Sequence, residues 1–324
     1  MKRILCFIFI MGLLYGIANA RLGGAGATFL SLGGGSRPLA LGGAYVAFAE
    51  GIDALYWNPA GIANINKTNF SFTHAELFAD MSYENIAFVY PLGDAAVGIS
   101  ILAFLSGDIE ETTLEYQEGT GDHFSCNDFA VGITYGRMMT KRFTAGATAR
   151  VINQNIWKCS ATGVAFDLGA TYNTGIRNLK FGFVVQNFGS DLVYSGEDLE
   201  GTLVMEGYEN IQESDIPYVL ASEPYPLPLT FQLGVSIDAL YSIIHRITVE
   251  ADLIHPNDQN ETYAAGVEYC YNNMFFLRGG HTQKNCRLWS TGFGVKLANM
   301  KVDYSYEHHR YLVGIHRISA GFSY

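Results

Sequence analysis

The sequence predicts an all-β protein that folds as a single 14-stranded antiparallel transmembrane β-barrel. Three observations lead to this fold class: a secretory signal at the start, long stretches in which apolar and polar residues alternate, and connections that alternate between short and long. Segments of about 9–11 alternating residues have the length that a tilted strand needs to cross a bilayer. A soluble β-sandwich would also alternate, so the number of strands and the character of their faces must decide between the two.

The amino-acid composition agrees with an all-β membrane protein. Of the 324 residues, 49% are hydrophobic, 14% are aromatic and 16% are charged, whereas soluble domains carry about 25% charged residues. Glycine (36 residues), tyrosine (20) and phenylalanine (21) are all abundant. The formal net charge of −11 leaves no basic field for binding phosphates, so we expect no nucleic-acid partner.

Residues 1–20 have the features of a secretory signal peptide. Lys2 and Arg3 precede the apolar run Ile4–Leu14, and Ala18-Asn19-Ala20 forms a small-residue cleavage site before Arg21. A membrane-anchoring helix is the alternative, but the run is shorter than the roughly 20 residues that a span requires. Export and the barrel pattern together predict the bacterial outer membrane as the location, with outer-membrane lipids as partners.

Residues 21–66 do not alternate and form a separate region ahead of the strands. They contain a glycine-rich run at 33–37, a helix-capable segment at 42–49 and the motif Asn58-Pro59-Ala60-Gly61. In this motif Asn58 can accept hydrogen bonds from backbone N–H groups two or three residues on, Pro59 fixes φ at the first turn position, and Gly61 permits a left-handed conformation. Turn chemistry accounts for each residue, so the motif is first a rigid structural corner.

Fourteen candidate strands follow. They start near residues 69, 83, 95, 124, 143, 164, 179, 228, 244, 261, 274, 287, 300 and 314. An even number lets both ends of a single-chain bacterial barrel return to the same side. Tight links fall at 91–94, 140–142, 173–175, 272–273 and 298–299, and longer connections fall at 105–123, 154–163, 189–227, 255–261 and 282–286. Short turns on one side and long loops on the other are typical of outer-membrane barrels.

The two faces of the predicted strands differ as lumen and lipid require. Because a Lys or Arg facing lipid at the midplane costs about 2–4 kcal/mol, charged positions should face a polar lumen. The charged residues on the inward faces are Asp167, Lys180, Glu250, Asp252, Glu268, Lys296 and Asp303. Outward aromatic residues near strand ends, as in interfacial girdles, are Tyr269, Tyr271, Tyr304, Tyr306, Phe322 and Tyr324. The last strand alternates up to the aromatic Tyr324, which predicts recognition by the barrel assembly machinery.

The N-terminal region carries a family resemblance. The pattern Arg37-x-x-x-x-Gly42-Gly43-Ala44, followed by the sequence Ala-Leu-Tyr-Trp-Asn-Pro-Ala-Gly at 54–61, resembles the PorV/PorQ family within the superfamily of FadL-type long-chain fatty-acid transporters. The resemblance implies a fourteen-stranded barrel whose N-terminal segment folds into the lumen as a hatch. The expected organisation is therefore a signal peptide at 1–20, a hatch at 21–66 and a barrel at 67–324. The resemblance is sharp over residues 33–62 and architectural over the rest.

The resemblance leaves two functions open. FadL-type transporters imply the passage of a hydrophobic small molecule across the outer membrane. Leu102 and Phe104 should then face the lumen, and together with Tyr56 and Trp57 they would line a ligand path or pack against the hatch. The alternative, implied by PorV-type members, is an accessory of protein secretion or surface attachment of the type IX kind. In that case the acidic loop 189–226 would dock a basic domain of a secreted protein.

The sequence carries no motif of an enzyme. A Walker pattern, a dinucleotide fingerprint and a Gly-x-Ser-x-Gly nucleophile elbow are all absent. His281, His308 and His309 lack cysteine or carboxylate partners at ligand spacing. We therefore expect no enzymatic activity, no cofactor and no metal site.

Four cysteines remain after processing: Cys126, Cys159, Cys270 and Cys286. Disulfides can form in this compartment. Paired positions in the hairpin around 140–142 should sum to about 282, and Cys126 and Cys159 sum to 285. Two alternatives stay open: a Cys126–Cys159 bridge at the outer rim, or four free thiols. Cys270 and Cys286 are expected at opposite rims and therefore unbonded.

Overall fold

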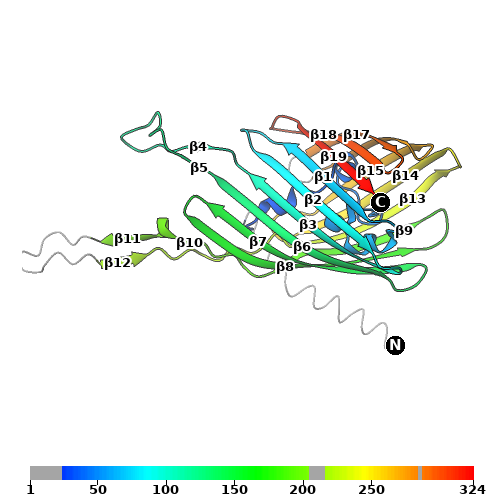
Figure 1. Cartoon of the computed structure of the whole chain (residues 1–324), viewed down its shortest axis with the longest axis horizontal. Helices are drawn as coiled ribbons and strands as arrows, with labels where there is room; N and C mark the ends of the chain where they lie inside the picture. Colours follow the sequence, from blue (N-terminus) through cyan, green and yellow to red (C-terminus); the bar gives the residue numbers. More distant parts are fainter. Residues whose placement is uncertain (1–23, 204–215, 284–286) are drawn as a thin grey trace, which may run out of the picture.

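The computed structural model describes residues 24–203, 216–283 and 287–324. In this part of the chain fourteen antiparallel strands form a closed barrel, in which β1 pairs with β2 on one side and with β19 on the other (Figure 1). In order around the wall, the strands are β1 (Asn69–Glu76), β2 (Ser82–Pro91), β3 (Ala95–Leu105), β6 (Cys126–Met138), β7 (Phe143–Ile156), β8 (Cys159–Asn173), β9 (Lys180–Gly189), β13 (Thr230–Tyr241), β14 (His245–Pro256), β15 (Thr262–Tyr271), β16 (Phe275–Thr282), β17 (Arg287–Leu297), β18 (Met300–His309) and β19 (Ile315–Ser323). The fold class, the number of barrel strands and their approximate starts agree with the prediction.

Long connections leave one end of the barrel, which we call the outer rim, and short turns join the strands at the inner rim. Small elements stand beyond the outer rim (Figure 1). They are β4 (Ile109–Glu110), β5 (His123–Phe124), β10 (Ser195–Gly196), η3 (Glu197–Leu199), β11 (Glu200–Leu203) and β12 (Ile216–Val219). β4 pairs with β5 and β11 pairs with β12, while β10 adds to the edge of β8.

The wall separates an apolar exterior from a more polar interior. On β6 the alternation is direct: Ile133 is 60% exposed, whereas the adjacent Thr134 is fully buried. The same strand also exposes Phe129, Val131 and Tyr135. An exposed apolar band around a closed sheet is the exterior that a bilayer requires. The protein is thus a barrel of the outer-membrane type. Among the described residues, no helix is long and apolar enough to cross a bilayer.

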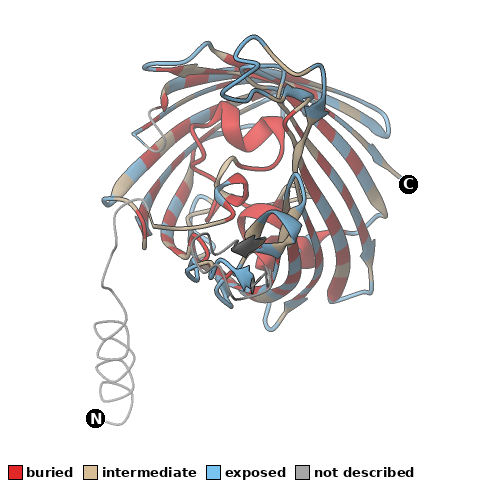
Figure 2. Cartoon of the chain, turned by 90° about the vertical axis from the view of Figure 1, so that its left-hand side faces the viewer, coloured by how far each residue is buried: buried red, intermediate tan, exposed pale blue. Residues whose placement is uncertain are grey.

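Residues 24–66, which we call the lumenal segment, lie inside the barrel (Figure 2). The segment contains η1 (Thr28–Ser31), α2 (Ser36–Ala40), α3 (Ala54–Trp57) and η2 (Pro59–Asn64). The stretch 42–49, which has the composition of a helix, is not helical. Gly42 and Gly43 have positive φ values of 74° and 83°, and the backbone N–H groups that follow bond to the wall instead of to each other.

Two expectations about the covalent structure have different outcomes. The predicted signal peptide lies outside the described residues, as does Cys286. The predicted Cys126–Cys159 bridge is wrong for this structure, because both cysteines are free. Cys126 and Cys159 pair with Ile156 from opposite sides, so β7 lies between them. Two strand spacings amount to roughly 10 Å, beyond the roughly 7 Å between Cα atoms that a disulfide can span. Cys270 is also free, as expected.

Candidate functional site

The candidate site is the lumen together with the segment that fills it. The Asn58-Pro59-Ala60-Gly61 corner lies against the inner faces of β6, β7 and β8. Asn58 is fully buried, and its Oδ1 accepts a hydrogen bond from the N–H of Ala60 at 3.1 Å, which starts η2 as predicted. Its Nδ2 lies within hydrogen-bond distance of the carbonyls of Val46 (2.9 Å), Ala170 (3.3 Å) and Phe183 (3.4 Å). One side chain therefore ties the corner to β8, to β9 and to the lumenal segment itself.

The predicted role of Gly61 needs correction. Gly61 is not among the residues with positive φ, so it does not adopt a left-handed conformation. A Cβ atom at this position would lie 2.7 Å from Cβ of Ala54 and would collide with the carbonyl of Ala49. Gly61 is required by close approach of two parts of the lumenal segment.

The wall residues that face the corner are also glycines. A Cβ atom on Gly146 of β7 would lie 2.5 Å from the carbonyl carbon and oxygen of Pro59, and one on Gly136 of β6 would lie 2.8 Å from the same oxygen. Real Cβ atoms do not approach backbone this closely. On this side of the barrel, the segment is held by shape rather than by charge.

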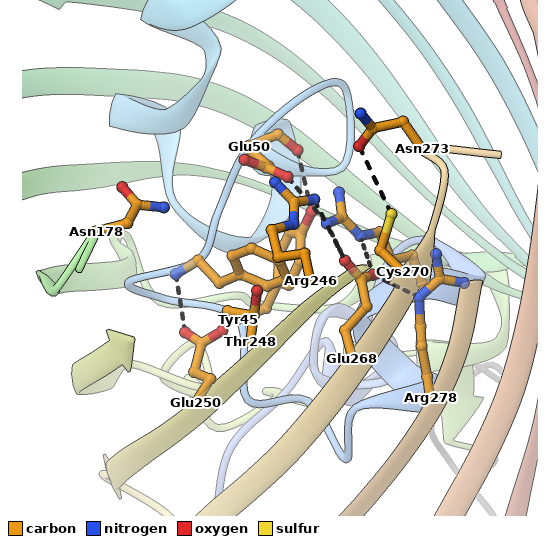
Figure 3. A network of polar contacts seen from close by, with 12 residues as sticks. Tyr45, Glu50, Asn178, Arg246, Thr248, Glu250, Glu268, Cys270, Asn273 and Arg278 are labelled. Atoms are coloured by element: carbon orange, nitrogen blue, oxygen red, sulfur yellow. Dashed lines mark hydrogen bonds and ion pairs between the residues drawn. The ribbon is translucent and has the colours of Figure 1, made fainter. Parts of the chain in front are cut away.

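Further around the wall, two carboxylates of β14 bind the backbone of the lumenal segment, and Figure 3 labels one of them, Glu250. Asp252 Oδ2 accepts hydrogen bonds from the N–H groups of Tyr45 (2.8 Å) and Val46 (3.1 Å). Glu250 Oε1 accepts from Ala47 (2.9 Å) and from the next residue, Phe48 (2.9 Å). Four consecutive N–H groups, which a helix or sheet would otherwise satisfy, are thus paired with the wall. Charge-assisted bonds of this kind are stronger than bonds between neutral groups.

A separate buried ion network joins α2 to β15, β16 and β18, and Figure 3 labels its members Glu50, Glu268 and Arg278. Arg37 of α2 binds Glu268 through two nitrogens, at 2.8 and 2.9 Å, and also binds Glu50 at 2.9 Å. Arg278 donates to Glu268 and to Asp303, both at 2.7 Å. Glu268 is 1% exposed. A carboxylate so deeply buried is tolerated because two guanidinium groups pair with it.

Tyr56 and Trp57 stabilise the lumenal segment from within. The Tyr56 hydroxyl donates to the carbonyl of Leu30, and Trp57 Nε1 donates to the carbonyl of Gly34 at 2.8 Å. Burial raises the pKa of Tyr56 to about 12, so its hydroxyl stays a donor at physiological pH. Both rings are buried. In this state they pack, and their predicted role as lining of a ligand path stays a prediction.

Leu102 and Phe104 are placed on the lumen side of β3, as the alternation predicts. Leu102 is 1% exposed and belongs to the apolar cluster in the lumen, and Phe104 packs against that cluster. The cavity that borders Tyr56 and Leu102 measures about 10 Å³, enough for one water molecule at most. A hydrophobic molecule would therefore need side chains of this cluster to move before it could pass them.

Several residues of the site were not expected from the sequence. Five of the seven predicted inward charges are indeed buried: Asp167, Glu250, Asp252, Glu268 and Asp303. Arg37, the partner of Glu268, enters the sequence analysis only as part of a motif. One signal could have indicated the pairing of Arg37 with Glu268. Arg37 is a single arginine in a glycine-rich segment, and the predicted inward faces carry several carboxylates. Among the described residues, no three His, Cys, Asp or Glu side chains are grouped to hold a metal ion.

Solved structures share this architecture of a closed barrel. CymD, a monoaromatic hydrocarbon channel, has a TM-score of 0.63 and 14% identity, with 90% of this chain and 98% of that chain covered. The Pseudomonas putida toluene transporter TodX has a TM-score of 0.57 and 15% identity, with the same coverage. A Pseudomonas aeruginosa FadL homologue has a TM-score of 0.51 and 12% identity, covering 86% of this chain and 95% of that chain. At these identities the likeness establishes the fold.

The fold is therefore that of the FadL-type outer-membrane channels. The chain belongs to the uncharacterised protein family UPF0164, whose model matches residues 20–324. No curated protein matches it in sequence. The finer resemblance to PorV/PorQ is not confirmed by these matches and stays a prediction.

Proposed function

We propose that the chain is a FadL-like channel that admits a hydrophobic small molecule across the outer membrane, with the lumenal segment acting as its hatch. The observation that carries this proposal is the apolar cluster inside the barrel. Phe29, Leu30 and Leu55 of the lumenal segment pack there against Leu102 and Ile152 of the wall. A site for a hydrophobic ligand requires apolar side chains of this kind.

The closed lumen supports a gated rather than an open path. The corner at Asn58, the carboxylates of β14 and the Arg37 network all bind the lumenal segment to the wall. Transport would require a part of this segment to move while the barrel stays intact. Two proteins of similar fold are a monoaromatic hydrocarbon channel and a toluene transporter, which makes small aromatic hydrocarbons the first solutes to test.

The proposed partners follow from the wall. The exposed apolar band would contact outer-membrane lipids. The backbone of Tyr324, the final residue, pairs with Thr68 through N–O distances of 2.8 and 3.1 Å, at the point where β1 and β19 close the barrel. The barrel assembly machinery would recognise β19, the strand that closes the barrel against β1. The secretion-accessory alternative is not favoured by the comparisons.

Uptake by cells tests the proposal. A Gram-negative host without its own FadL-type channel should take up radiolabelled toluene or oleate several times faster when it expresses this protein. Leu102→Trp should reduce that uptake, because the larger ring obstructs the apolar cluster. Ile101→Trp is the matched control, since Ile101 is the neighbouring outward residue. Equal uptake with and without the protein would contradict the proposal, and a secreted cargo recovered on it would favour the alternative.

A further inference from the structure

The feature that the proposed channel leaves unexplained is the base of its longest extracellular connection. Residues 190–229 join β9 to β13, and the outer part of this connection, with β10, β11 and β12, extends far beyond the outer rim (Figure 1). Its two legs return to the barrel at Leu192 and at Leu227. These legs, residues 190–194 and 224–229, are called the loop base below.

Leu192 differs sharply from its neighbours in burial. It is fully buried, while residues 188–191 and Val193 are exposed. Its side chain lies between two glycines. A Cβ atom on Gly26 would lie 3.4 Å from its Cδ1, and a Cβ atom on Gly163 of β8 would lie 2.7 Å from its Cδ2. The position of Leu192 therefore depends on the missing side chain at Gly163, while Gly26 lies at ordinary van der Waals distance.

Leu192 belongs to the apolar cluster of the lumen. Besides Leu192 itself, the cluster includes Phe29 and Leu30 of the lumenal segment, Ile152 of β7 and Leu227 of the loop base. Leu192 thus inserts into the outer end of the region that we propose as the path of a hydrophobic solute. A solute group of similar apolar area would recover the same apolar burial at this position.

The loop base is also bonded to the start of the lumenal segment. Leu192 and Tyr225 exchange two backbone hydrogen bonds, at 2.8 and 2.9 Å, so the legs hold each other. The N–H of Gly26 donates to the carbonyl of Pro226 at 2.8 Å. Withdrawal of the loop base would therefore break one of the bonds at the outer end of the lumenal segment, where the N–H of Ala27 is also bound to Gln154 of β7 at 3.0 Å.

We propose that Leu192 is a movable stopper: the loop base closes the outer end of the lumen, and its withdrawal opens an apolar site that takes a small apolar solute. This inference rests on the proposed function for the identity of the solute. It adds a second closure to the one at the Asn58 corner, at the opposite end of the lumenal segment.

A reversible crosslink tests whether the loop base must move. In a chain with its four mature cysteines replaced by serine, we would introduce Gly26→Cys and Tyr225→Cys. The Cβ positions of these residues lie 3.2 Å apart, close to the 3.5–4.5 Å found in disulfides. Oxidation should reduce toluene uptake at least ten-fold, and reduction should restore it in the same protein.

The matched control places a crosslink in the wall of the same rim. Asn153→Cys and Thr162→Cys replace side chains of β7 and β8 that are hydrogen-bonded at 3.0 Å. These strands are already paired, so this bridge should leave uptake unchanged. Toluene uptake that is equal in the oxidised and reduced states of the Gly26→Cys/Tyr225→Cys protein would overturn the inference.

Thiol labelling tests the stopper independently of transport. Leu192→Cys should react slowly with a membrane-impermeant maleimide and at least ten-fold faster when toluene is added. Val193→Cys, at a residue that is 51% exposed, should react fast in both conditions. Labelling of Cys at 192 that does not respond to toluene would contradict the stopper even if the cells take up toluene. A response without uptake would retain the stopper and reject the transport function.

Discussion

The two sides of the barrel wall hold the same lumenal segment by different means. Along β14–β18, carboxylates and arginines bind it through charged hydrogen bonds, as at Glu250 and at the Arg37–Glu268 pair. Along β6–β8, the wall is glycine where the corner touches it, and Asn58 supplies the polar contacts. The charged side adds specific bonds to a close fit, since Gly266 and Gly280 of its wall also touch the segment, whereas the β6–β8 side relies on fit and on the amide of Asn58. The two sides should therefore fail differently when they are altered.

The largest effect is expected on the charged side. Glu268→Ala removes the carboxylate shared by Arg37 and Arg278 and leaves both guanidinium groups buried without it. We expect a loss of about 4 kcal/mol, within the 3–5 kcal/mol typical of a broken buried pair. Urea unfolding of the protein in liposomes, followed by its heat-modifiable mobility, measures the loss. Glu76→Ala, at an exposed residue of the same barrel, is the control, and equal stability of the two variants would refute the role of the network.

A smaller effect is expected from overfilling the β6–β8 side. Gly146→Val would place new atoms against the carbonyl of Pro59, so the corner has to shift, at about 3 kcal/mol or less. Because the fit fails at the inner rim, we expect raised conductance in planar bilayers with the barrel still folded. Ala147→Val, one residue along on the outward face, should behave like the parent. A Gly146→Val protein with parental conductance and stability would show that the corner does not depend on this fit.

Removal of the amide at the corner should cost less again. Asn58→Ala abolishes the cap on Ala60 and the contacts with Val46, Ala170 and Phe183, for an expected loss of about 2 kcal/mol. The exposed Asn64, at the end of η2, provides the control as Asn64→Ala. Conductance and urea unfolding should both change for Asn58→Ala only. Identical behaviour of the two variants would show that the Asn58 amide does not hold the corner.

The smallest change is expected at Pro59. Pro59→Ala keeps every side-chain hydrogen bond of the corner and loses only ring rigidity, worth about 1 kcal/mol. Its unfolding midpoint should lie between those of the parent and Asn58→Ala. If Pro59→Ala opens the barrel more than Asn58→Ala does, the ring rather than the amide holds the corner.

The sequence could predict features that depend on neighbouring residues, but not contacts between distant ones. Strand alternation and loop lengths depend on neighbouring residues, so the fourteen strands and the inward position of Glu250, Glu268 and Leu102 could be read directly. Contacts between distant parts could not. Nothing near Arg37 indicates that its partner lies 231 residues away.

The local preference for helix was overridden where side chains of the wall accept hydrogen bonds from the backbone of the lumenal segment. The stretch 42–49 has the composition of a helix, yet Glu250 and Asp252 take up the N–H groups of residues 45–48. Gly61 was expected to provide a left-handed turn, but close packing inside the segment explains it. The Cys126–Cys159 bridge failed because an estimated register cannot show that β7 lies between the two residues.

The central claim is that the lumenal segment closes an otherwise open barrel. The most direct measurement is the single-channel conductance of the parent protein and of a variant that lacks residues 21–66, both in planar bilayers. The account predicts a nearly closed parent and a large, stable conductance after deletion, with the barrel still heat-modifiable. A parent that already conducts strongly, with no change on deletion, would contradict the claim.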